Sequence, residues 1–170
     1  PRYQANVQTY TFSKGGRKIY DIVFQVSNHD IAFKYRVYSQ DNILCCIVKK
    51  EATGFMLPEG STTFLCPQAA PMGGFARTSP SYETSYTVDD VTGKNGWGNG
   101  YTFPCLFKNE DKGWILISET GVSSAYCGSR LLGKENGLYT IGFPQEGEYN
   151  GNGTVSPGIA LPGETPWRTI

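Results

Sequence analysis

Two glutamates stand where a carboxylate can bind a sugar or a hard cation. Glu83 lies between Tyr82 and Tyr86, just after a long loop, and Glu119 follows the apolar run Trp114–Ser118. Aromatic rings stack on sugar rings, and carboxylates bind hydroxyl groups or Ca²⁺. The pattern therefore favours a carbohydrate or calcium site, while the alternative is that both glutamates are exposed strand residues, as most glutamates are.

Trp97 is a further candidate for contact with a sugar. It lies in a glycine-rich stretch, residues 93–100, where its ring can stack on a sugar or pack against the protein.

Other common catalytic patterns are missing from the sequence. The only histidine, His29, sits next to Asp30 in a polar segment, which is typical of a solvated turn. The chain has no GxSxG elbow, no P-loop and no GxGxxG that opens a helix. We therefore expect neither Ser-His-Asp chemistry nor a nucleotide site.

The cysteines do not predict a metal site. Their number is odd, none are spaced as CxxC, and His29 is the single histidine, so we do not expect a Cys/His zinc site. We expect them to behave as small buried hydrophobic residues. The five are Cys45, Cys46, Cys66, Cys105 and Cys127.

Charge and hydropathy argue against nucleic-acid binding and against a membrane-spanning segment. The 15 Lys and Arg balance the 15 Asp and Glu, and charged residues are only 18% of the chain. A nucleic-acid binder would need a surplus of basic side chains. The longest unbroken apolar run, Ile43 to Val48, is far shorter than the roughly 20 residues that cross a bilayer. We therefore expect no nucleic-acid partner and no membrane span.

Residues that alternate between apolar and polar types dominate the pattern. Between residues 20 and 26, Tyr20, Ile22, Phe24 and Val26 fall on one face, and a polar segment at residues 27–30 separates this run from a second one at residues 31–38. Two alternating runs around a short polar turn predict a β-hairpin.

Further short strands follow at similar spacing, separated by glycine- and proline-rich turns, and no helical apolar stripe is present. Asn109–Gly113 is predicted to be a hairpin loop. This pattern predicts an all-β fold, a large antiparallel β-sandwich. The predicted strands are Ile43–Lys50, Gly54–Leu57, Thr62–Leu65, Ser81–Val88, Tyr101–Lys108, Trp114–Ser118, Arg130–Leu132, Leu138–Phe143 and Pro166–Ile170.

The ends of the chain suggest a piece of a longer protein. The first residue is Pro1, and the last residues fall within the extended run Pro166–Ile170. We expect residues 1–170 to form one incomplete domain whose function depends on residues outside it.

Four segments, in order along the chain, give the sequence a family resemblance. The chain resembles the N-terminal domain of glycoside hydrolase family 97 at the segments Asn28–Arg36 (family pattern DG-(V/I)-A-F-R-Y-R), Tyr82–Tyr86 (Y-E-x-x-Y), Ile117–Glu119 (tEA/SEA) and Thr165–Arg168 (T-P-W-R). His29 replaces the usual glycine, and Thr120 stands where alanine is common.

The resemblance implies a fold and an activity that spacing alone does not reveal. Family members are exo-acting α-glycosidases, mostly α-glucosidases and α-galactosidases, exported to the periplasm or cell envelope of Gram-negative bacteria. Their N-terminal domain is a super-sandwich similar to galactose mutarotase, of which this chain would lack the first strands. A catalytic (β/α)8 barrel, expected downstream of Ile170, carries the main catalytic carboxylates and completes the oligosaccharide site.

The same resemblance assigns roles to the two glutamates. The N-terminal domain donates a glutamate toward a Ca²⁺ near the active site, and Glu83 matches that position best, as a calcium ligand or as support for the rim of the substrate pocket. Glu119 is the second choice, and Trp97 is a weaker candidate for contact with substrate. No catalytic residue is expected within the chain itself. Two alternatives stay open: a free-standing carbohydrate-binding sandwich, and a purely structural sandwich that supports a neighbouring domain.

Overall fold

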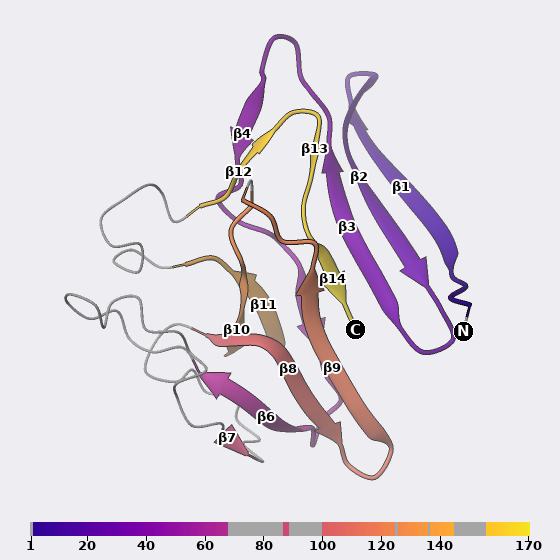
Figure 1. Ribbon diagram of the computed structural model, residues 1–170, viewed down its shortest axis with the longest axis vertical. Helices are drawn as coiled ribbons and strands as arrows, with labels where there is room; N and C mark the ends of the chain where they lie inside the picture. The colour runs from indigo at the N-terminus through magenta and orange to yellow at the C-terminus, as the bar shows by residue number, and fades with distance from the viewer. Residues whose placement is uncertain (1, 68–86, 89–99, 125, 136, 145–155) are drawn as a thin grey trace, which may run out of the picture. The chain divides into compact units, whose positions relative to one another are not determined.

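The computed structural model describes most of the chain, and every regular element in that part is an antiparallel β-strand (Figure 1). The described residues are 2–67, 87–88, 100–124, 126–135, 137–144 and 156–170. The chain divides into two compact units: unit 1 comprises Pro1–Val48, Ser118–Tyr126 and Pro157–Ile170, and unit 2 comprises Lys49–Ile117 and Cys127–Ser156. The predicted all-β class is confirmed.

Unit 1 is built around three long strands, which run side by side in Figure 1. The order is β1-β2-β3-β14, followed by the last residues of β9; β13 also pairs with β3, and β4 pairs with β12 in a small separate sheet. The bounds are β1 Asn6–Lys14, β2 Arg17–Val26, β3 Ile31–Val37, β4 Cys45–Ile47, β9 Gly113–Thr120, β12 Gly158–Ala160, β13 Gly163–Glu164 and β14 Trp167–Thr169.

The predicted hairpin is the pair β2–β3, joined by a short turn. The hydroxyl oxygen of Ser27 accepts the backbone N–H groups of His29 and Asp30, each at 3.1 Å. Because side chains alternate along a strand, the aromatic residues of both strands share one face. The rings of Phe24 and Phe33 lie 5.5 Å apart between centroids. The alternation in the sequence therefore gave the correct strands and the correct faces.

Strand β1 was not predicted. All nine of its residues are exposed, so neither face is marked by a run of apolar residues. It is nevertheless fixed by rings on the aromatic face of the hairpin: Phe12 stacks on Tyr20 at 4.6 Å, and Tyr10 meets Phe24 edge-on at 6.0 Å.

Unit 2 is also an antiparallel sheet. The first residues of β9 pair with β8, and the order continues β8-β10-β11-β5, while β6 pairs with β8 and β7. Its bounds are β5 Gly54–Met56, β6 Thr62–Pro67, β7 Thr87–Val88, β8 Tyr101–Asn109, β10 Arg130–Glu135 and β11 Leu138–Gly142.

The core of unit 2 contains side chains with no exposed surface, Leu65, Cys105, Phe107 and Leu131 among them. The predicted hairpin loop between β8 and β9 is confirmed, since Lys112 N–H donates to the carbonyl of Asn109 at 2.9 Å. Strands Gly54–Leu57, Thr62–Leu65, Tyr101–Lys108, Trp114–Ser118, Arg130–Leu132, Leu138–Phe143 and Pro166–Ile170 are all found within a few residues of their predicted bounds.

The cysteines only partly follow the prediction. Cys66 and Cys105 are buried, and burial raises the pKa of both thiols. Cys45 is exposed, so the expectation of a buried hydrophobic residue is wrong there. The reason is that β4 is a three-residue strand in a two-stranded sheet, which leaves its outer residues exposed.

Candidate functional site

One of the three residues singled out by the sequence can be placed. Glu83 and Trp97 lie outside the described residues. Glu119 lies near the end of β9, in unit 1. The geometry of the site is therefore built from Glu119 and its neighbours.

Glu119 faces the T-P-W-R segment across the sheet. Its partner in the register of β9 and β14 is Arg168, and Arg168 is in turn paired with Phe33 of β3. Strand β14 thus lies between β9 and β3, and Arg168 shares the aromatic face with Phe33.

Hydrogen bonds hold both ends of residues 165–170 on β3. Thr165 N–H donates to the carbonyl of Tyr35 at 2.9 Å, and the Thr165 hydroxyl accepts the Tyr35 N–H at 3.0 Å. At the other end, Ile170 and Ile31 exchange hydrogen bonds of 2.8 and 2.9 Å. The register of residues 165–170 is therefore set, and with it the face on which Arg168 lies.

Arg168 and Glu119 form a buried ion pair. The Nη1 atom of Arg168 donates to Oε2 of Glu119 at 2.6 Å, and the two side chains are 0% and 9% exposed. Removing a guanidinium from water costs several kcal/mol unless a carboxylate lies beside it. Glu119 is therefore the counter-ion of Arg168, and a cation bound at the same oxygen would be repelled by the guanidinium.

The described residues contain no group of three or more His, Cys, Asp or Glu side chains that could hold a metal ion. Glu119 is thus not part of such a group. The calcium site predicted from the sequence depends on Glu83, whose position the structure does not describe.

A second polar cluster, not predicted, lies on the opposite face of the sheet. Asp21 of β2 is 2% exposed and accepts hydrogen bonds from Thr11 at 2.8 Å and from Tyr38 at 2.6 Å. The hydrogen bond from Tyr38 is the main reason that the pKa of Asp21 is lowered, and Arg36, with Nη1 at 3.8 Å, acts in the same direction. The carboxylate is thereby held in its charged form.

This cluster continues to β13 and β14. Arg36 Nε donates to Glu164 at 2.9 Å, and Lys34 also binds Glu164, which is the main reason that the pKa of Glu164 is lowered. The ammonium of Lys34 lies 4.6 Å from the ring centroid of Trp167, within the range of a cation–π contact. Trp167 is thus held on one face of β14 and Arg168 on the other.

Asp21, Lys34 and Arg36 share one face of the hairpin because Asp21 pairs with Arg36 and Val23 with Lys34 in the register of β2 and β3. The sequence does not reveal the contribution of Glu164, because β13 is only two residues long and carries no pattern. The sequence separation between Glu164 and its partners on β3 likewise hides the contact.

The fold defines the chain as an antiparallel β domain of the sandwich class, with a carboxylate–arginine pair that fixes its last strand. The family model described as Glycosyl-hydrolase 97 N-terminal matches residues 1–170. The chain therefore belongs to glycoside hydrolase family 97 and corresponds to the N-terminal region of that family.

Solved structures agree with the family and the fold. The crystal structure of a β-arabinopyranosidase is 50% identical over 99% of this chain, with a TM-score of 0.91. Structures of a family 97 enzyme from Pseudoalteromonas sp. strain K8, in complex with panose or acarbose, are 24% identical over 98% of this chain, with TM-scores of 0.73 and 0.72. These matches confirm the predicted antiparallel β-sandwich.

The chain spans about a quarter of those structures, 27% of the first and 23% of the others. No curated protein matches the sequence. In the described part of the chain, no helix has the length and apolar character needed to cross a bilayer.

Breaking the Arg168–Glu119 pair is expected to destabilise the protein strongly. Glu119→Gln leaves a buried guanidinium without its carboxylate, and Arg168→Met leaves the carboxylate without its cation, at about 3–5 kcal/mol each. Denaturant titration measures the free energy of unfolding. The double variant is expected to lose less than the sum of the single losses, and strict additivity would contradict the pair.

The control for this prediction is Arg17→Met. Arg17 and Asp41 are also 2.6 Å apart, but their side chains are 66% and 71% exposed. Solvent screens such a pair, so its loss is expected to cost less than about 1 kcal/mol.

Acid is expected to weaken unit 1 through Asp21. Because its pKa is lowered in the folded state, the unfolded state binds more protons between that value and the ordinary pKa of about 4. The free energy of unfolding is therefore constant above this window and falls as the pH drops through it. Asp21→Asn should flatten that fall, measured by denaturant titration at a series of pH values.

Glu164 contributes to the same acid dependence, because its pKa is also lowered, so Asp21→Asn removes only part of it. The control is Asp41→Asn, which changes an exposed carboxylate in unit 1. A pH profile of Asp21→Asn that matches the unsubstituted protein would show that Asp21 does not stabilise the fold through its charge.

Proposed function

We propose that this chain is the N-terminal domain of an exo-acting glycosidase that removes a terminal pyranose from an oligosaccharide. The observation that supports it most is the 50% identity to a β-arabinopyranosidase over 99% of the chain. Because the chain spans 27% of that structure, we expect most of the enzyme, including the catalytic barrel, outside these residues. The family resemblance adds an exported enzyme, periplasmic or attached to the envelope of a Gram-negative bacterium.

The substrate class follows from sugar stereochemistry. β-L-Arabinopyranose has the ring configuration of α-D-galactopyranose and lacks only the exocyclic hydroxymethyl group. One small group of this kind changes binding by about 1–3 kcal/mol, so related enzymes can differ in which of the two sugars they prefer. We therefore rank α-galactosides and β-arabinopyranosides first, and α-glucosides, which differ in configuration at C4, second.

The chemistry of such an enzyme requires two groups supplied by the barrel. An acid protonates the leaving oxygen, and either a water activated by a base or a carboxylate nucleophile attacks C1. The role proposed for this chain is to shape the rim of the active site. Trp167 is suited to that role because it is half-buried and its ring lies 4.6 Å from the ammonium of Lys34, while the adjacent Arg168 is held by Glu119.

Calcium is part of the proposal, with Glu83 as the ligand from this domain. The preference for Glu83 over Glu119 is supported by the ion pair, since Oε2 of Glu119 binds Arg168 at 2.6 Å. Carboxylate oxygens are ligands that Ca²⁺ prefers. The experiment on Glu83 below tests this assignment.

Hydrolysis by the full-length enzyme tests the substrate class. We expect release of nitrophenol from the aryl β-L-arabinopyranoside or α-galactoside at a higher kcat/KM than from the aryl α-glucoside. The 170-residue chain alone is expected to release none. Activity of the isolated chain, or no activity of the full-length enzyme on any of the three glycosides, would contradict the proposal.

Replacement of Glu83 tests the calcium assignment. In the full-length enzyme, Glu83→Gln should shift the calcium titration of activity to higher concentration and lower kcat/KM, because a charged ligand is lost. Glu59→Gln is the matched control, since Glu59 is an exposed carboxylate in the described part of the chain. If Glu83→Gln titrates like Glu59→Gln, the assignment of Glu83 as the calcium ligand is wrong.

A further inference from the structure

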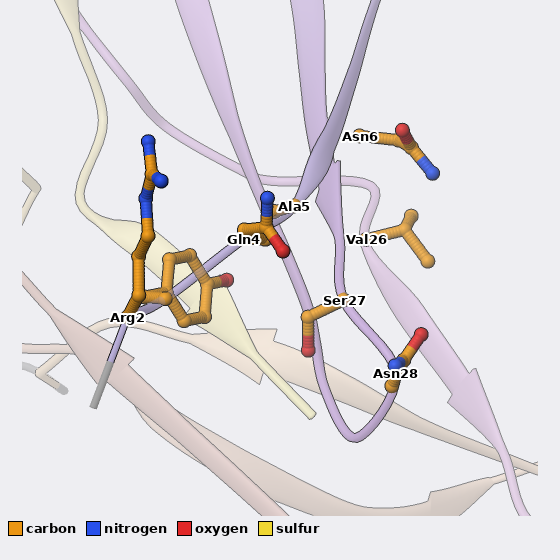
Figure 2. Close-up of a pocket in the computed structure, with 8 residues that line it drawn as sticks. Arg2, Gln4, Ala5, Asn6, Val26, Ser27 and Asn28 are labelled. Carbon is orange, nitrogen blue, oxygen red and sulfur yellow. The ribbon is translucent and has the colours of Figure 1, made fainter.

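A polar pocket of about 600 Å³ lies in unit 1, beside the β2–β3 turn. Figure 2 shows that its walls come from two segments, the chain that leads into β1 and the start of the turn. The two lie together because Asn6 pairs with Val26. The polar side chains that line it are Arg2, Tyr3, Gln4, Asn6, Ser27 and Asn28.

The walls of this pocket are held by hydrogen bonds. The Tyr3 phenol donates to Oδ1 of Asp30 at 3.0 Å, which ties the first wall to the turn. Ser27 accepts two backbone N–H groups of the turn, from His29 and Asp30, so the second wall is also fixed. The pocket is thus formed before a ligand arrives.

The chemistry of the lining matches a sugar unit. Tyr3 supplies an aromatic ring that is 63% exposed. Side-chain amides present a donor and an acceptor in one plane, and a guanidinium presents paired donors, and both suit adjacent hydroxyl groups. The volume falls within the range of about 300–1,000 Å³ that is usual for small-molecule sites. The lining side chains include no carboxylate, which argues against a cation, and six of the eight lining residues are polar, Ala5 and Val26 being the aliphatic ones, which favours a polar ligand.

We propose that this pocket binds one sugar unit of an oligosaccharide, with the ring of Tyr3 against the sugar and Gln4, Asn6 and Asn28 on its hydroxyl groups. The choice of a saccharide rests on the proposed function, because the family acts on carbohydrates. The site itself rests on the geometry of residues that neither the sequence patterns nor the family resemblance assigned.

Calorimetric titration of the full-length enzyme with galactose, L-arabinose and panose tests this proposal. We expect one binding event per chain to weaken about tenfold in Tyr3→Ala, because a stacked ring is lost, and to weaken in Gln4→Ala as well. Trp114→Ala is the matched control. Trp114 is 62% exposed, a fraction similar to the 63% of Tyr3, and it does not line the pocket. Tyr3 and Gln4 are both at the surface, so we expect both variants to fold, and circular dichroism is the check.

Two results would overturn the inference. The first is titration of Tyr3→Ala and Gln4→Ala that matches Trp114→Ala for all three sugars. The second is an equal loss of sugar affinity in Trp114→Ala, which would show that removal of any exposed ring has this effect. The proposed function fails separately: aryl glycoside hydrolysis by the unsubstituted enzyme reports on it and does not depend on this pocket.

Discussion

A guanidinium with no exposed surface is stable in a protein only when a carboxylate lies beside it, and this constraint organises unit 1. Arg168 is such a group, and Glu119 is its counter-ion at 2.6 Å. The two residues stand on neighbouring strands, so the pair fixes the register of β14 against β9 as well as the charge. The desolvation cost of a buried ion is several kcal/mol, and the attraction between the two charges offsets it only while the strands stay paired.

The opposite face of the same sheet carries a series of charged residues that ends at Trp167, the residue next to Arg168. Asp21 binds Tyr38, Glu164 binds Arg36 and Lys34, and Lys34 lies over the ring of Trp167. Trp167 and Arg168 are thus held from the two faces of one strand. Trp167, which is half-buried, is thus a rigid group that a neighbouring domain can contact, which suits the N-terminal region of glycoside hydrolase family 97.

The sequence predicted elements whose faces differ, and it missed those whose faces do not. The hairpin at residues 20–38 alternates between aromatic and polar residues, so both strands and faces were correct, whereas β1 is exposed along its whole length and shows no contrast. Strand β13, with two residues, is too short to carry a period. Glu119 and Arg168 were each singled out by motif, but only the register of strands 49 residues apart brings them together. Glu83 and Trp97, the other candidates, remain predictions.

Amide hydrogen exchange tests the central claim, that the buried pair holds the last segment of the chain on its sheet. In the unsubstituted protein, Ile170 N–H donates to Ile31 at 2.8 Å and Thr165 N–H to Tyr35 at 2.9 Å, so both amides should exchange slowly. In Glu119→Gln we expect both to lose protection while the amides of the β1–β2 pair keep theirs. Unchanged protection of Ile170 and Thr165 in that variant would contradict the account.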